Sequence, residues 1–304
     1  MGVTTALPQR VRTWLWPLAV ANLVANIGIV VTGGAVRLTG SGLGCPTWPR
    51  CTDASYVVRP ELGLHGLIEF GNRMLTWVLA AIAIACWVAA WRSGRRRATR
   101  LATVIALGIP AQAVIGGVTV LTELNPWIVA FHLLVSMAII GVCVLLLDEL
   151  RGPPRPDAGV RARRLGWLVL ASGWLVLYLG TVVTGSGPHA GDADSPRTGL
   201  DPQLMSHVHA WAVYLLLALT VGLVALAHRS GSVVARRAAL TLLGVELAQG
   251  LVGFAQYFTD LPPLLVGLHL LGAALVSASL TWAVAALRPH DPLAQGASAT
   301  TVGR

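Results

Sequence analysis

Residues 249–271 read QGLVGFAQYFTDLPPLLVGLHLL, and residues 112–134 read QAVIGGVTVLTELNPWIVAFHLL. At a shift of 137 residues, nine of the 23 aligned positions are identical, including a glutamine, a glycine, a Thr-x-Leu-x-Pro turn and the pair His132 and His269. A shared apolar composition alone does not align these polar positions. The chain is therefore predicted to be a tandem repeat of two halves, each with a histidine at the same place.

The composition is that of a membrane protein. Of 304 residues, 55% are hydrophobic and only 12% are charged, and the mean hydropathy is +0.69. Such values are typical of chains that cross a bilayer several times. The net charge of +9 comes from arginines, which lie mostly in short segments between apolar runs. They indicate membrane topology and argue against a nucleic-acid partner.

Eight apolar runs are long enough, at about 20 residues, to cross a bilayer. They lie at 15–36, 68–91, 101–121, 127–147, 165–184, 204–227, 237–257 and 263–287. Arginines precede the first run and follow the second, fourth and sixth, so the positive-inside rule places both termini in the cytoplasm. The predicted fold is an all-α integral protein of the plasma membrane, with eight transmembrane helices in two pseudo-twofold-related four-helix bundles.

The domain boundaries follow from the repeat and from an Arg- and Pro-rich segment between its copies. Residues 1–150 are predicted to form the N-terminal half, 151–164 a cytoplasmic linker, 165–290 the C-terminal half and 291–304 a flexible tail. Two long loops, at about 37–67 and about 185–203, lie on the predicted outer side. There is one in each half, so each could cap a site at the outer end of its bundle.

Cys45 and Cys51 lie in the first of these loops, outside the reducing cytosol. Two closely spaced cysteines in that compartment favour a disulfide over free thiols or a metal site.

Two histidines of the second half lie at a matching depth. His209 and His269 are each about six residues into their spans from the outer side, which is ~10 Å at ~1.5 Å per residue. Two imidazoles at one depth on different helices can bind a haem iron from its two faces. The alternative is a pair of hydrogen-bonded interhelical histidines, but a matched pair in a repeat favours ligands.

The first half offers a less regular set. His132 matches His269, but the same shift carries His209 back to Asn72, and asparagine is a poor iron ligand. His65 lies about two helical turns before Asn72 and could replace it, provided that the helix begins early enough. This asymmetry suggests two tasks. One half would hold a haem firmly as a cofactor, and the other would hold a haem that must enter and leave.

Glu69 and Arg73 flank Asn72 near the outer end of the second span. Ionisable side chains inside a membrane are candidates for function. A carboxylate at Glu69 suits acid–base chemistry or stabilisation of positive charge beside a loosely held haem. The alternative is an i,i+4 ion pair that only neutralises itself. Gln112, Gln249 and Glu246 also lie within spans, where helix–helix hydrogen bonding accounts for them.

These residues together resemble the haem A synthase family. The resemblance rests on RLTGSGLGCPTWPRC after the first span, IEFGNR at the second, LGTVVTGSGPHAGD at the fifth, and one histidine on each of spans four, six and eight. It covers about residues 15–287. It implies a haem b cofactor bound by His209 and His269, a haem O substrate bound near His132, and an essential glutamate at Glu69. The implied reaction oxidises a ring methyl of haem O to a formyl group by successive hydroxylation, and the resulting haem A serves cytochrome c oxidase.

One position departs from the family pattern. The family motif is Glu-x-x-His-Arg, whereas this chain has Glu69-Phe-Gly-Asn72-Arg73. The iron of the substrate would then have His132 on one side and Asn72, water or His65 on the other. The partners that the resemblance implies are haem O, the haem O synthase that makes it, an electron acceptor such as a quinone, and the lipid bilayer. A homo-oligomer is a further candidate, and no motif in the sequence specifies the oligomeric state.

Two other classes of protein fit the sequence less well. A di-haem b-type electron-transfer subunit of a quinone oxidoreductase would require two complete histidine pairs, but here one pair lacks a histidine. A parallel-repeat transporter would want broken helices and a polar midplane, but the centres of these spans are apolar.

Overall fold

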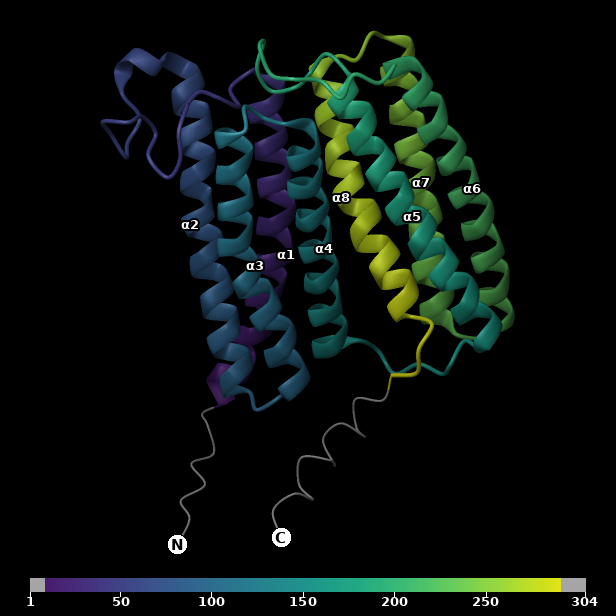
Figure 1. The fold of residues 1–304 in the computed structure, drawn as a ribbon. Helices are drawn as coiled ribbons and strands as arrows, with labels where there is room; N and C mark the ends of the chain where they lie inside the picture. The colour runs from purple at the N-terminus through teal and green to yellow at the C-terminus, as the bar shows by residue number, and fades with distance from the viewer. Residues whose placement is uncertain (1–8, 291–304) are drawn as a thin grey trace, which may run out of the picture. The chain divides into compact units, whose positions relative to one another are not determined.

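The computed structural model describes residues 9–290, and the predicted tail 291–304 lies outside them. The described residues form eight α-helices (Figure 1): α1 (Gln9–Leu38), α2 (Gly63–Arg92), α3 (Arg96–Leu121), α4 (Pro126–Arg151), α5 (Val160–Ser186), α6 (Pro202–Arg229), α7 (Val233–Phe258) and α8 (Pro263–Ala285). A short 3-10 helix, Pro60–Leu62, precedes α2. All eight are long and apolar enough to cross a membrane. The prediction of an all-α, multi-pass membrane protein with eight spans is confirmed.

The helices extend beyond the apolar runs at several ends. α5 begins at Val160, so its first turn takes in residues 160–164, which were expected to belong to the linker. The sequence there is VRARR, and arginine and alanine both favour helix. The polar starts of α6 and α7 are capped: Oδ1 of Asp201 accepts a hydrogen bond from Leu204 N at 2.6 Å, and Oγ of Ser232 accepts one from Ala235 N at 3.3 Å.

The chain divides into two compact units, and each is described here by itself. The first contains the residues up to Leu150 together with His189–Pro196, and the second contains Arg151–Pro188 together with the residues from Arg197 on. The short segment His189–Pro196 follows α5 in sequence but packs with the first unit. There, Nε of Arg37 donates to His189 O at 2.5 Å, and Gly42 N donates to Gly191 O at 2.8 Å.

Each unit has its own apolar core, built from all four of its helices. The first core draws on α1 to α4 and includes Leu15, Cys86, Ile105 and Leu146. The second draws on α5 to α8. In the second core, a Cβ atom at Gly173 would lie 2.3 Å from Cδ1 of Leu280, so the glycine lets α5 and α8 approach closely.

The repeated Thr-x-Leu-x-Pro segment forms the same tight turn in both halves. Glu123 and Leu124 have φ angles of 53° and 60°, and Asp260 and Leu261 have φ angles of 57° and 57°. This left-handed conformation is unfavourable for residues other than glycine. In the first unit, the side chain of Leu124 is only 8% exposed. A Cβ atom added at Gly42 would lie only 2.6 Å from Cδ1 of Leu124, so this side chain packs tightly against the first long loop. Burial of the leucine thus offsets the strain of its backbone.

We predict that Leu124→Ala destabilises the protein by about 2 kcal/mol, because it removes a buried side chain and leaves a cavity between the turn and the loops. Leu261→Ala is the matched control, because Leu261 has the same backbone conformation but is only half-buried. Thermal unfolding of the purified protein, followed by tryptophan fluorescence, measures both. Equal losses would show that burial of Leu124 does not stabilise the turn.

Candidate functional site

Three histidines within the bundles each pack against a glycine of a neighbouring helix. His132 on α4 faces Gly116 on α3, where an added Cβ would lie 3.3 Å from Cε1 of the ring. The second unit repeats this arrangement twice. A Cβ at Gly180 on α5 would lie 3.3 Å from Cε1 of His209, and one at Gly253 on α7 would lie 3.4 Å from Cε1 of His269. Each glycine therefore makes room for an imidazole close to the backbone of the adjacent helix.

Each of the three rings also has an unpaired nitrogen. Nδ1 of His132, of His209 and of His269 is buried and has no hydrogen-bond partner among the described residues. A buried polar atom without a partner costs about 1–3 kcal/mol, so such atoms usually mark a function or a missing ligand. A haem iron is bound by imidazole nitrogens inside helix bundles. Because Nδ1 is enclosed beside the neighbouring helix, Nε2 is the ring nitrogen that would bind an iron, and imidazoles at these glycines fit the haem groups that the sequence suggested.

The described residues do not contain a group of three or more His, Cys, Asp or Glu side chains that could hold a bare metal ion. Axial binding of a haem iron needs only one or two imidazoles, because the porphyrin supplies the other four ligands. In the second unit, His209 lies on α6 and His269 on α8, each about two turns from the start of its helix. The matching depth of the two histidines is seen in the helix bounds, and their pairing at one haem stays a prediction.

Two glutamines hold the backbone of histidine-bearing helices. Nε2 of Gln112 donates to the carbonyl oxygen of His132 at 3.0 Å, and Nε2 of Gln249 donates to that of His269 at 2.9 Å. Each glutamine lies four residues before the glycine that faces the same histidine, so both lie on one face of α3 or of α7. The predicted helix–helix hydrogen bonds are confirmed, and they end on the histidine residues themselves.

Asn72, which stands at the position of His209 in the repeat, forms a hydrogen bond with α1 in the first unit. Its Oδ1 accepts a hydrogen bond of 2.7 Å from Oγ1 of Thr32 on α1. The sequence GIVVTG at 28–33 on α1 resembles GTVVTG at 180–185 on α5, which aligns Gly28 with Gly180. Gly28 has no atom within 4 Å of its would-be Cβ, whereas Gly180 packs against His209. The glycine of α1 that lies near Asn72 is Gly33, where an added Cβ would be 4.0 Å from Nδ2 of the amide.

His65 lies in the first turn of α2, so the helix does begin early enough to include it. Its Nδ1 is 2.9 Å from Oγ of Ser41, which is fully buried in the first long loop. The imidazole is mostly exposed, unlike that of His132. The structure therefore places His65 at the loop end of α2, attached to the loop.

Glu69 and Arg73 form a buried ion pair that also binds the disulfide loop. Oε1 of Glu69 accepts from Nε of Arg73 at 3.0 Å and from Nη2 at 2.5 Å, and its Oε2 accepts from the backbone N of Cys45. The guanidinium group donates to three loop carbonyls, those of Cys45, Thr47 and Arg50. The predicted i,i+4 pair is present, and its hydrogen bonds extend to the loop backbone.

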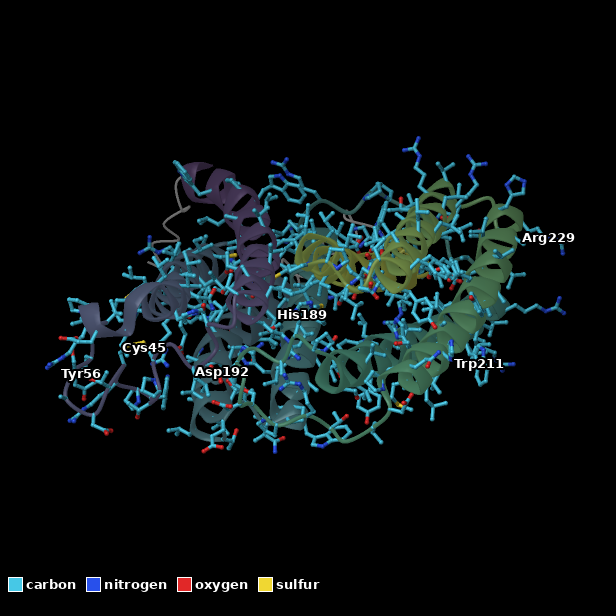
Figure 2. The ribbon with its side chains drawn as sticks, turned by 90° about the horizontal axis from the view of Figure 1, so that it is seen from above. Cys45, Tyr56, His189, Asp192, Trp211 and Arg229 are labelled. Carbon is cyan, nitrogen blue, oxygen red and sulfur yellow. A yellow bond between two sulfur atoms is a disulfide. The ribbon has the colours of Figure 1, made fainter. Side chains whose placement is uncertain are left out.

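The Cys45–Cys51 disulfide that the sequence favoured is present and closes this loop. Figure 2, which looks down on the loop end, labels Cys45 and Tyr56 in the same segment. Between the cysteines, Trp48 lies against α3, since a Cβ at Gly117 would be 2.3 Å from Cδ2 of its indole. Gly117 follows Gly116, the residue that faces His132. The disulfide loop is therefore attached to both α2 and α3 beside the histidine.

Sequence reasoning missed the glycines that receive the histidines, the bond from Thr32 to Asn72, and the position of Trp48. Gly116 and Gly253 are identical positions of the repeat, so their match carried a usable signal. The other contacts join residues of unrelated spacing and left no such signal.

Comparisons with known proteins agree with this description. The sequence profile of the COX15-CtaA family, described as cytochrome oxidase assembly protein, matches residues 13–65 and 59–194. A heme A synthase of Lysinibacillus sphaericus is 31% identical over 184 residues, which cover 58% of this chain and 59% of the relative. A heme A synthase of Geobacillus thermodenitrificans is 34% identical over 136 residues, which cover 42% and 40%.

Those two alignments thus span about half the length of the relatives. A heme A synthase of Rhizorhabdus wittichii is 27% identical over 336 aligned positions, which cover 91% of this chain and 93% of the relative. The family profile extends over more than half of the 304 residues. The chain therefore belongs to the COX15-CtaA family of cytochrome oxidase assembly proteins.

Proposed function

We propose that this protein is a haem A synthase, which oxidises a ring methyl of haem O to a formyl group. The observation that carries the proposal is the set of three half-buried histidines, each with a buried, unpaired Nδ1 and each packed against a glycine. Two of them share the second unit, and one lies in the first. Membership of a cytochrome oxidase assembly family, with relatives named heme A synthase, supports the same activity.

The second unit is proposed to hold haem b as a resident cofactor. His209 on α6 and His269 on α8 would bind its iron, because each lies about two turns into its helix and packs against a glycine of a neighbouring helix. Gln249 fixes the backbone of His269, and Gly180 and Gly253 leave room for the rings. Such a haem, when bound, supplies one-electron transfer.

The first unit is proposed to receive haem O. His132 would bind one face of the iron, with Gln112 holding its backbone. Asn72 would face the other side. Its Oδ1 is occupied by Thr32, which leaves Nδ2 free to donate to a group bound in the site. His65 is the second candidate for that side, because its Nδ1 bonds to Ser41 and its Nε2 remains. A single strong imidazole ligand suits a substrate that must leave after reaction.

Glu69 is proposed as the catalytic carboxylate, and Arg73 as a residue of the same substrate site. Glu69 is buried and one helical turn from Asn72, so it can stabilise positive charge or exchange a proton near the substrate. Its hydrogen bonds to Arg73 and to the disulfide loop fix the orientation of the carboxylate. The loop that carries Trp48 would cover this site and exclude water.

The arginine distribution supports a topology with both termini in the cytoplasm and both haem sites toward the outer side. Oxidation of a methyl group releases electrons, so an acceptor such as a membrane quinone is a required partner, and a haem O synthase must supply the substrate. The alternative of a di-haem electron-transfer subunit is not favoured by the family or by Asn72 in the place of a histidine.

We expect haem A, or its hydroxylated precursor, to form when this protein is produced in a host that supplies haem O and lacks its own haem A synthase. Haem extraction from membranes followed by chromatography measures the product, and the host without the protein is the control. Bound haem b without any modified haem would contradict the synthase proposal and favour an electron carrier.

We expect His209→Ala and His269→Ala each to lower the haem b content of the purified protein about tenfold or more, because each removes an iron ligand. His207→Ala is the matched control. It lies on the same helix, but its exposed ring contacts Tyr257 instead, at 3.4 Å. Absorption spectra of the reduced protein give the haem content. Full occupancy in both variants would move the cofactor site elsewhere.

We expect Glu69→Gln to lower haem A formation about 100-fold, the usual scale for loss of an acid–base group, and to leave the haem b spectrum unchanged. Glutamine keeps one acceptor oxygen, which can serve Arg73 or Cys45 N but not both. The bonds from the Arg73 guanidinium to the carbonyls of Cys45, Thr47 and Arg50 do not involve the carboxylate, so the loop should remain attached. The thermal unfolding temperature of the variant tests that attachment. Unchanged haem A formation would mean that Glu69 only anchors the loop.

A further inference from the structure

The described part of the chain contains three buried glutamates, and one of them lacks a counter-charge. Glu69 pairs with Arg73 at 2.5 Å, and Glu149 pairs with Arg95 at 3.5 Å and with Arg97 at 3.4 Å. Glu246, in the middle of α7, is 3% exposed. Its Oε1 accepts a 2.9 Å hydrogen bond from Oγ1 of Thr220 on α6, and its Oε2 has no partner.

The repeat shows that packing does not require this polar pair. A shift of 137 residues carries Thr220 to Ala83 and Glu246 to Ile109. Both first-half residues are buried in the first core, with exposures of 1% and 3%. The same fold therefore fills these two positions with an apolar pair in one half and with a threonine and a carboxyl group in the other. Since buried carboxyl groups in a membrane are costly, their presence points to function.

The polar pair lies in line with the proposed haem b site. Glu246 precedes Gly253, which faces His269, by seven residues, and Thr220 follows His209 by eleven. These spacings are close to two and three helical turns. Glu246 therefore lies on the same face of α7 as Gly253, and Thr220 lies on the same face of α6 as His209. The carboxyl group is about 10 Å along α7 from the level of Gly253, toward the end of the bundle where α6 and α7 are joined.

No other charged side chain lies near this level on the four helices of the second unit. The arginines of α5, α6 and α7 are at helix ends, and the closest on α7 is Arg237, nine residues from Glu246. The titratable groups within the helices are His209 and His269 at the proposed haem site, His207 and His228 toward the two ends of α6, and Tyr178, Tyr214 and Tyr257. Thr220 is the hydrogen-bond partner that faces Glu246.

We propose that Glu246 is a proton-binding site coupled to the redox state of the cofactor in the second unit, an inference that rests on the proposed haem b site. Oxidised iron porphyrin has one more positive charge than the reduced form. When an electron arrives from substrate oxidation, the Glu246 carboxylate takes up a proton that originates in water, and an O–H bond forms at Oε2. When the electron leaves to a quinone-class acceptor, that proton is released. The charge of the buried site therefore stays constant through each cycle.

The test is a redox titration of the purified full-length protein with its haem b, repeated over a range of pH. In the wild type, the midpoint potential should fall as pH rises, because reduction takes up a proton. Glu246→Gln keeps the hydrogen bond to Thr220 but cannot exchange a proton, so it should lose this pH dependence. Infrared difference spectra between oxidised and reduced protein should contain a carboxylic-acid signal that Glu246→Gln removes.

A double variant, Thr220→Ala with Glu246→Ile, reproduces the apolar pair of the first half and guards against failure to fold. It should retain bound haem b and also lose the pH dependence. Glu149→Gln, a buried glutamate of the first unit, is the control that should keep it. The proposal would be overturned if the midpoint potential of both Glu246 variants kept the pH dependence of the wild type, or if the wild type gave no carboxyl signal. Glu246 would then serve only as a helix–helix hydrogen-bond partner.

The assay for haem A separates this inference from the proposed function. A wild type with pH-dependent haem b but no haem A formation would overturn the synthase proposal and leave the role of Glu246 intact. If the wild type forms haem A but its midpoint potential has the same pH dependence as that of the Glu246 variants, the role of Glu246 would be overturned and the synthase proposal would stand. A wild type that binds no haem b would overturn both.

Discussion

The structure depends on one recurring contact, an imidazole that packs against a glycine of the next helix and keeps a nitrogen unpaired. The glycine is needed because a Cβ at Gly116, Gly180 or Gly253 would press against the ring. An unpaired nitrogen inside an apolar bundle is costly unless a ligand binds it. The same contact brings two helices close together and holds an imidazole for the haem groups proposed above, and it occurs in both units.

The two halves use this common frame differently, and the differences fit two tasks. His209 in the second half corresponds to Asn72 in the first, where Thr32 occupies the amide oxygen. The second half alone has the buried Thr220–Glu246 pair. A firmly bound cofactor benefits from two strong ligands and a nearby charge-balancing group. A substrate that must dissociate benefits from one strong ligand and an adjustable second side.

Buried charge connects the first bundle to its loop. The Glu69–Arg73 pair would be expensive in an apolar environment if it stood alone, but its remaining hydrogen-bonding groups are satisfied by the backbone of the loop closed by Cys45 and Cys51. Removal of either charge would leave the other without its counter-charge and would remove part of the attachment of the loop. The acidic residue proposed for catalysis and the cover of the site are therefore linked by the same hydrogen bonds.

The sequence by itself determined the class of fold, the number of spans, the disulfide and the candidate histidines. These follow from local hydropathy, from the compartment of a cysteine pair and from a repeat of constant spacing, all of which are visible along the chain. Only the tertiary structure decided that Thr32 donates a hydrogen bond to Asn72 and that Glu69 accepts one from Cys45 N. It also decided that Glu246 has no counter-charge. Those facts depend on which residues of different helices meet, and no short-range pattern records the rotation of one helix against another.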